Sequence, residues 1–455
     1  MDYESIINNL KQNIEKFQDY EDKTSTSKVI NRFLKDLAIY HNHDYTEING
    51  SYYIKKGVYP KAIIHLNIDS SFSNKAFNFI FNENQIEAEK SINIFTAILV
   101  IGQLIDQSTN DFDVLITNNN IQSDLKNYEY LTYILRSDKI INLNLSKAWC
   151  IADEFSSLIL SNVKVPVERY EPNFEYKTYR ITLDNLIGGH TGEDLDKLRL
   201  NSIKTLMALI RRIKSKVDLD IFRFVGGDRY DFIPSYAYTD FIIKSEYQSD
   251  LFNFFNLLKN EFIEKNLKFE PDMLLELNEI EDSSLLPINE LSFSHLSSFV
   301  ELLPTGAYAV NSLNNQLISS LNLSTARTFD SFINFIIVYR SLTEESMKEM
   351  QEKTLTAASI SSSLVTNGFS IPKWMNKDET LTNIFKKVYQ DLTQQELPVI
   401  KTQYSLDSSM IFSKLNVSII SLGVEYKQRE DNTCYSNLFD IATVANLIDN
   451  VLASI

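Results

Sequence analysis

Few stretches of the sequence bring reactive residue types close together. The run HNHD contains His41, His43 and Asp44, and imidazole and carboxylate groups are zinc-ligand types. It lies at the end of a predicted N-terminal helix, which favours adventitious over functional metal binding. The serines at 361–363 and Cys434 have no recognisable base partner, so nucleophilic catalysis has no support.

Glycine, which lets a backbone approach phosphates and metals closely, is scarce. The chain has 11 glycines in 455 residues, about 2.4% against a usual ~7%. Five of them lie at positions 188, 189, 192, 226 and 227, and residues 103–187 contain none. Phosphate-cradling folds need glycine in their tight loops. The composition therefore argues against a dinucleotide- or phosphate-binding protein.

The charge balance and the apolar pattern exclude several classes of partner. Hydrophobic residues make up 44% of the chain. The formal net charge is -16, and a negative charge opposes binding to nucleic acid. No apolar run reaches membrane-spanning length, and the N-terminus lacks the order of a signal peptide. Cys150 and Cys434 fit reduced thiols in a cytosolic chain. We expect a cytoplasmic protein that binds neither nucleic acid nor membrane.

The two ends of the chain share an α/β pattern. Apolar spacing predicts helices over 1–20, 27–39, 92–105, 381–392 and 438–452, and β-branched runs predict strands over 61–69, 113–117, 140–145 and 417–422. Such alternation predicts a mostly parallel mixed sheet with helices on both faces.

The middle of the chain has a different order of elements. Strands are predicted over 176–183, 219–224, 236–243 and 269–277, with helices over 194–214 and 250–266. This βαββαβ order is that of a ferredoxin-like α+β unit. A further helix at 293–303 and strands at 317–325 and 331–340 continue it. The predicted organisation is an α/β domain of residues 1–177 and 366–455, with residues 178–365 inserted as a second domain.

Six landmarks in order resemble one family. The segment LIGGHTGEDLDKLRLNSIKTL (186–206) resembles the lid motif of aminoacyl-histidine dipeptidases, zinc peptidases that cleave carnosine-type dipeptides. The other landmarks are LDIFRFVGGDRYDFIP (219–234), LPTG (303–306), SLNL (320–323), Arg340-Ser341 and Trp374. The resemblance covers nearly the whole chain and implies a peptidase-like domain with an inserted lid and dimerisation domain.

The resemblance also implies a two-zinc site with a general-base Glu, yet the matching positions carry other residues. They are Asn67, Asp69, Asn119, Asn144 and Asp431. The turn that would carry the bridging Asp is missing near Lys90, and the Glu pair falls on residues 119–121. Neutral amides bind Zn²⁺ poorly. We therefore expect no bound metal. The vestigial positions should still converge at the carboxyl edge of the sheet.

Four lid residues are candidates for ligand binding, each with a structural alternative. They are His190, Asn201, Asp231 and Arg340. His190 could reach a ligand or satisfy backbone groups, and Arg340 could bind a ligand or form a buried ion pair. Asn201 could bind a carboxylate, although solvent exposure is favoured, and Asp231 favours an ion pair with Arg229. His65, as a lone strand histidine, favours a hydrogen-bonded core residue over a metal ligand.

The leading hypothesis is a pseudo-peptidase that lacks the zinc pair and binds a peptide or protein partner. The alternative is an active metal-dependent dipeptidase or amidohydrolase with a displaced zinc site, built from His65, Asp69 and Asp431. A third hypothesis is a subunit of a larger complex that reads a peptide. Pairing through lid domains, as the resemblance implies, favours a homodimer.

Overall fold

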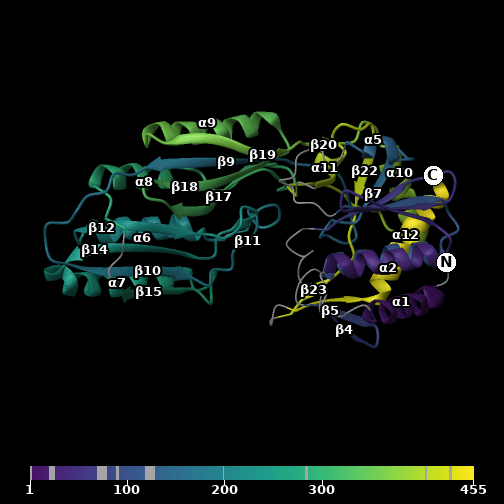
Figure 1. Cartoon of the computed structure of the whole chain (residues 1–455), viewed down its shortest axis with the longest axis horizontal. Helices are drawn as coiled ribbons and strands as arrows, with labels where there is room; N and C mark the ends of the chain where they lie inside the picture. The colour runs from purple at the N-terminus through teal and green to yellow at the C-terminus, as the bar shows by residue number, and fades with distance from the viewer. Residues whose placement is uncertain are drawn as a thin grey trace. The chain divides into compact units, whose positions relative to one another are not determined.

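The computed structural model describes residues 3–19, 26–68, 79–88, 92–117, 129–197, 199–281, 285–404, 407–429 and 433–455. The chain forms two compact units (Figure 1). Unit 1 contains Met1–Phe155, Trp374–Lys401 and Leu406–Ile455, and unit 2 contains Ser156–Lys373 and Thr402–Ser405. Within the described residues, no helix combines the length and apolar character needed to cross a membrane.

Unit 1 is built on a mixed sheet of order β1-β2-β6-β3-β7-β22-β8-β20, with β21 paired to β8. Its strands are β1 (Asp44–Ile48), β2 (Ser51–Lys56), β3 (Ile63–Asn67), β6 (Phe112–Thr117), β7 (Lys139–Asn142), β8 (Ile151–Phe155), β20 (Trp374–Met375), β21 (Val399–Thr402) and β22 (Ser418–Ser421). Strands β6, β3, β7 and β22 are parallel neighbours. The strands that flank this centre pair antiparallel. The predicted α/β class is confirmed, with parallel pairing confined to the centre of the sheet.

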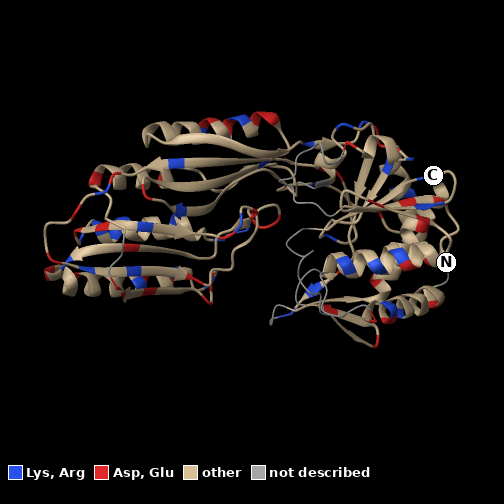
Figure 2. Ribbon diagram, viewed as in Figure 1, with Lys and Arg blue, Asp and Glu red and all other residues tan. Residues whose placement is uncertain are grey.

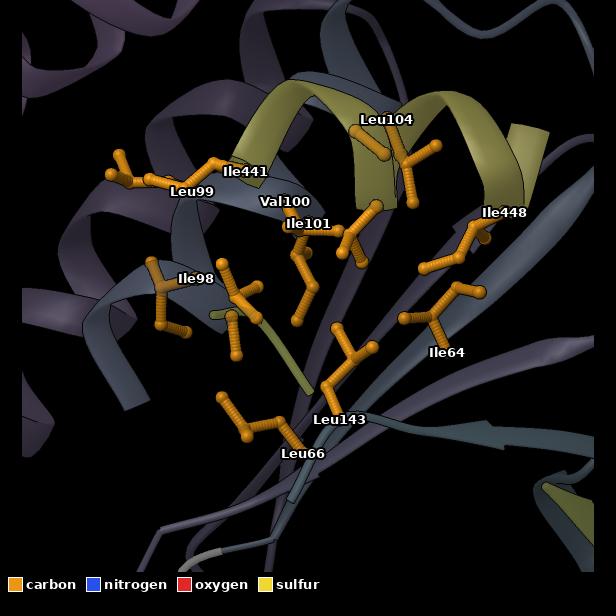
Figure 3. Packing of buried hydrophobic residues seen from close by; sticks show 14 of the residues in the cluster. Ile64, Leu66, Ile98, Leu99, Val100, Ile101, Leu104, Leu143, Ile441 and Ile448 are labelled. Carbon is orange, nitrogen blue, oxygen red and sulfur yellow. The ribbon is translucent and has the colours of Figure 1, made fainter. Parts of the chain in front are cut away.

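The helices of unit 1 flank this sheet, and most of them share one apolar core with it. They are α1 (Tyr3–Gln18), α2 (Thr26–Tyr40), α4 (Ile92–Gln107), α5 (Leu131–Ile134), α10 (Thr380–Thr393), α11 (Asp407–Ile411) and α12 (Leu438–Ser454). A small sheet contains β4 (Phe79–Asn82), β5 (Gln85–Ala88), β23 (Lys427–Gln428) and β24 (Cys434–Asn437). Figure 3 shows Ile64 and Leu66 of β3 meeting apolar side chains of α4 and α12. Because strand side chains alternate, His65 and Asn67 point to the opposite face, where the His65 ring lies 5.1 Å from that of Phe412.

Unit 2 is an antiparallel sheet of order β15-β10-β14-β12-β17-β18-β9-β19, with β16 paired to β17. Its strands are β9 (Ser157–Pro166), β10 (Tyr176–Asp184), β12 (Leu219–Gly226), β14 (Ala237–Lys244), β15 (Leu274–Glu279), β16 (Gly306–Val310), β17 (Leu317–Thr328), β18 (Phe332–Ser341) and β19 (Leu364–Ile371). Its helices are α6 (Ser202–Lys214), α7 (Gln248–Asn266), α8 (Glu290–Leu302) and α9 (Glu344–Ile360), with a 3₁₀ turn at Ser245–Tyr247. A two-stranded sheet joins β11 (Gly189–His190) to β13 (Phe232–Ile233).

The βαββαβ unit is present as β10-α6-β12-β14-α7-β15, with the strand order β15-β10-β14-β12. This is the ferredoxin-like arrangement predicted from the sequence. The strands of this unit and those at 61–145 belong to separate sheets.

The boundaries of unit 2 differ from the predicted residues 178–365. Strand β9 pairs along its whole length with β18, and β19 pairs with β9. Both strands therefore belong to the sheet of unit 2, which begins at Ser156 and runs to Lys373. Helix α6 also begins later than the predicted residue 194, because Asn201 caps it.

Charged residues of both signs lie along helix α9 of unit 2. Figure 2 marks Lys positions between Glu positions along the ribbon of α9. Acidic and basic residues therefore lie close together on this helix.

Candidate functional site

The carboxyl ends of the parallel strands in unit 1 bring polar residues to one edge of the sheet. Strand β3 ends at Asn67, β6 at Thr117, β7 at Asn142 and β22 at Ser421. Asn144 follows β7 by two residues. In open α/β sheets this edge is where ligand sites lie. We call His65, Asn67, Thr117, Asn142, Asn144 and Ser421 the strand-end cluster.

Two predicted site residues, Asn67 and Asn144, bond directly to each other. The backbone N–H of Asn67 donates to Asn144 Oδ1 at 2.8 Å, and Asn144 Nδ2 donates to the Asn67 carbonyl at 2.7 Å. Thr117 Oγ1 donates to Asn67 Oδ1 at 2.6 Å. Asp69, Asn119 and Asp431 lie outside the described residues. The convergence is therefore observed for this pair and stays a prediction for the other three.

His65 is a hydrogen-bonded core residue in this cluster. Its side chain is fully buried. Asn142 Nδ2 lies 3.1 Å from His65 Nδ1, and His65 Nε2 lies 3.0 Å from Thr117 Oγ1. Because an amide nitrogen can only donate, Nδ1 accepts and the ring proton resides on Nε2. Burial lowers the pKa of His65 to about 3, so the ring is neutral at physiological pH.

Asn142 makes hydrogen bonds within the cluster through both its amide nitrogen and its amide oxygen. Besides its contact with His65, Nδ2 donates to Asn144 Oδ1 at 2.8 Å. Its Oδ1 accepts from Ser421 Oγ at 2.6 Å and from the Asn144 backbone N–H at 3.1 Å. Asn142 is almost completely buried. Sequence reasoning missed Asn142, Thr117 and Ser421, although each is a polar residue that ends an apolar run.

The donor chemistry of the strand-end cluster does not fit a zinc pair. Zinc needs neutral imidazoles with a free nitrogen, thiolates or carboxylates. Both nitrogens of His65 are engaged, and the other side chains are neutral amides and hydroxyls. Among the residues that the structure describes, no three His, Cys, Asp or Glu side chains group around a common point. In the HNHD run, one ring nitrogen of His41 is likewise engaged, because its Nε2 lies 2.7 Å from a carboxylate oxygen of Asp106.

A second polar cluster lies in unit 2 around Arg340 of β18. This side chain is only 3% exposed, so its charge is costly to bury. Its Nε donates to Thr191 Oγ1 at 3.1 Å and an Nη donates to the Gln403 carbonyl at 3.3 Å. The ion pairs found within the described residues do not include Arg340. The predicted structural alternative, a buried ion pair, is therefore not what the described structure has. Burial lowers the pKa of Arg340, yet a guanidinium stays protonated in proteins.

His190 lies beside this arginine. Its ring is tilted against that of Tyr404, with centroids 4.8 Å apart, and meets Phe232 edge-on at 5.8 Å. The backbone N–H of Gly192 donates to Nδ1 at 3.1 Å, which leaves the ring proton on Nε2. Burial, followed by the charge of Arg340, lowers the pKa of His190 to about 3. His190 is therefore a neutral ring with one N–H to offer.

The other two lid candidates support local structure. Asn201 caps α6 by accepting from the Lys204 N–H at 3.2 Å, and its Nδ2 donates to the Leu323 carbonyl at 2.9 Å. It therefore faces β17 rather than solvent, because an N-cap side chain must turn back to the helix end. Asp231 pairs with Arg229 at 2.6 Å, the local ion pair expected from the sequence.

Comparison with known proteins places the fold. No protein-family model matches the chain, and no curated protein matches its sequence. The aminoacylhistidine dipeptidase of Vibrio alginolyticus has a similar structure, with a TM-score of 0.67 and 15% identity over 96% of both chains. A tripeptidase of Staphylococcus aureus gives 0.52 and 12% over 98% of both chains. An M20 family metallo-carboxypeptidase of Sulfolobus solfataricus gives 0.50 and 11%, over 97% of this chain and 98% of that one.

These likenesses define the class to which the architecture belongs. The chain has the mixed α/β fold of M20 peptidases, with a separate lid domain. The resemblance to aminoacyl-histidine dipeptidases is thus confirmed at the level of the fold. At such low identities, activity has to be argued from the residues of this chain.

Proposed function

We propose that this chain is a pseudo-peptidase: a protein with the M20 peptidase fold that lacks the two-zinc centre and acts by binding a peptide or protein partner. The observation that carries the proposal is the strand-end cluster, whose described members are neutral and bonded to one another. Zinc-dependent peptide hydrolysis requires charged ligands and a base that deprotonates water. Amide and hydroxyl groups supply neither.

The hydrogen bonds of the cluster also oppose metal entry. A zinc ion at His65 would have to displace Asn142 or Thr117 from a ring nitrogen, leaving a buried polar group without a partner. Each such loss costs about 1–3 kcal/mol. The displaced site proposed as the alternative therefore has little support at its histidine.

The cluster around Arg340 supports the binding half of the proposal. A buried guanidinium that bonds only a hydroxyl and a carbonyl among the described residues retains capacity for an anion. A peptide carries such an anion at its C-terminus. The N–H of His190 and the ring of Tyr404 would then lie beside the bound chain end.

We expect the purified protein to hold less than one zinc per ten chains. It should release no histidine from a carnosine-type dipeptide, and excess EDTA should leave its melting temperature unchanged. The physical reason is that the cluster satisfies its own polar groups and needs no cation. Elemental analysis, an amino-acid release assay and thermal denaturation measure the three quantities. Two zinc ions per chain, removed by EDTA together with hydrolysis and with several degrees of melting temperature, would contradict the proposal.

We expect a free dipeptide acid to bind at least tenfold more tightly than its C-terminal amide, because charge-assisted hydrogen bonds contribute about 1.5–3 kcal/mol. Isothermal titration with β-alanyl-histidine and its carboxamide measures the difference. Arg340→Gln should abolish it, whereas Arg212→Gln, which removes an exposed arginine paired with Glu261, should leave it intact. Equal affinity for acid and amide in the unsubstituted protein would rule out carboxylate recognition.

The homodimer also remains a proposal. Lid-domain pairing in the similar family and the prevalence of twofold symmetry support it. Light scattering of the whole chain at micromolar concentration should give twice the mass of one chain, and a single-chain mass would contradict it.

A further inference from the structure

Unit 1 contains a pocket that the strand-end cluster does not use. Its lining comes from α1, α10, α12, the start of β8 and the residues that follow β22. Its lining residues share an uncharged character. They are Tyr3, Trp149, Cys150, Ile151, Tyr389, Leu392, Thr393, Leu397, Leu422, Gly423, Thr443, Val444, Asn446 and Leu447.

The size of the pocket limits its occupant to a small molecule. Its volume is about 90 Å³, well above the ~15 Å³ that one water needs. An apolar protein cavity of about 150 Å³ accepts benzene, so this smaller pocket has room for one aromatic ring at most. Three of the lining side chains, Tyr3, Trp149 and Tyr389, are themselves aromatic, and rings pack well against rings.

One polar group of the pocket lacks a partner. Tyr389 is only 7% exposed, yet its hydroxyl bonds to none of the residues that the structure describes. The hydroxyl oxygen is not fully enclosed either, since it is not one of the described buried atoms that lack a partner. The hydroxyl therefore keeps some accessible surface, and Tyr389 is one of the residues that line the pocket. Buried tyrosine hydroxyls usually find a hydrogen-bond partner, which here would come from a ligand or a water.

The backbone at the pocket rim is also unusual. Trp149 has φ of +56°, a left-handed conformation that is rare for a bulky residue. Residues held in such conformations are found preferentially at ligand sites. Trp149 remains 37% exposed and is one of the residues that line the pocket.

We propose that this pocket binds an uncharged, mainly apolar small molecule of about one aromatic ring, whose single hydrogen-bonding group contacts the Tyr389 hydroxyl. A charged ligand would be buried here without a counter-charge, since no lining residue is ionised at neutral pH. The inference does not depend on whether the strand-end cluster holds zinc.

The test uses the whole chain and two fluorinated probes, 4-fluorobenzyl alcohol and 4-fluorotoluene, followed by ¹⁹F NMR titration. Both should bind, and Tyr389→Phe should weaken only the alcohol, by about threefold to tenfold, the range of one neutral hydrogen bond. Tyr133→Phe removes the hydroxyl of a tyrosine that is 88% exposed elsewhere in unit 1 and should change neither affinity. Equal weakening of both probes by Tyr389→Phe, or no binding of either probe, would overturn the proposal.

Two further variants locate the probe. Thr443→Phe should fill the pocket and abolish binding of both probes. In a Cys434→Ser background Cys150 is the only thiol, and both native cysteines are free. Burial raises the pKa of Cys150, so its alkylation by iodoacetamide is followed at pH 8.5. Bound alcohol should slow the reaction at least threefold. If Thr443→Phe loses its folded structure, the thiol result decides, and unprotected Cys150 would show that the probe lies elsewhere.

Discussion

Replacing Asn142 by Leu is expected to lower the free energy of unfolding of unit 1 by about 3 kcal/mol or more. The Asn142 amide makes four hydrogen bonds in the strand-end cluster. Leucine has nearly the same volume but leaves groups of His65, Asn144 and Ser421 without partners. Each buried unsatisfied group costs about 1–3 kcal/mol, and the members of one network fail together. Urea denaturation followed by tryptophan fluorescence measures the loss.

The control replaces an asparagine with no such role. Asn84 lies exposed in the turn between β4 and β5, and Asn84→Leu should change the unfolding free energy by less than about 0.5 kcal/mol. Whether Asn142→Leu lowers or raises the free energy of unfolding distinguishes a structural role of the cluster from a ligand-binding role. Polar groups kept for ligand binding commonly reduce stability. A stabilised Asn142→Leu protein would therefore identify the cluster as a working binding site.

The helices and strands with a clear spacing of apolar residues could be predicted from the sequence. Helix α4 is apolar around its whole circumference because it is buried on nearly all sides, and such a run is recognised without ambiguity. The order of the ferredoxin-like unit followed from spacing alone. Its boundaries could not, because β9 and β19 join the sheet only through pairing with distant strands. Such pairing leaves no local signal.

Only some residues of the candidate site could be predicted, because contacts between distant strands leave no local signal in the sequence. Asn67 and Asn144 were found because strand ends gather at one edge of a parallel sheet. Thr117, Asn142 and Ser421 were missed because hydrogen bonds between strands cannot be deduced from one strand at a time. The role of Asn201 shows the same limit: its type is typical of an N-cap, but the predicted helix began eight residues too early for that role to be seen.

The acid sensitivity of unit 1 should depend on His65. Its pKa is lowered to about 3 in the folded chain by burial, against about 6.5 in the unfolded chain. The unfolded state therefore binds the proton more readily between these values, so the free energy of unfolding falls as the pH drops below 6.5. The maximal slope is about 1.4 kcal/mol per pH unit, which amounts to roughly 2 kcal/mol between pH 7.5 and pH 5.0. At pH values well above 6.5 this contribution is fully present and constant.

Replacing His65 by Gln removes this titration, so the decrease in unfolding free energy between pH 7.5 and pH 5.0 should shrink by about 2 kcal/mol. Both tryptophans, Trp149 and Trp374, belong to unit 1, and their fluorescence during urea denaturation reports this unit. His295→Gln, on α8 of unit 2, should leave the decrease unchanged. Any general cost of the Gln side chain cancels in the difference between the two pH values. An unaltered decrease in His65→Gln would mean that the imidazole is protonated, or reached by water, in the folded protein, and a ring nitrogen would then be free to meet a ligand.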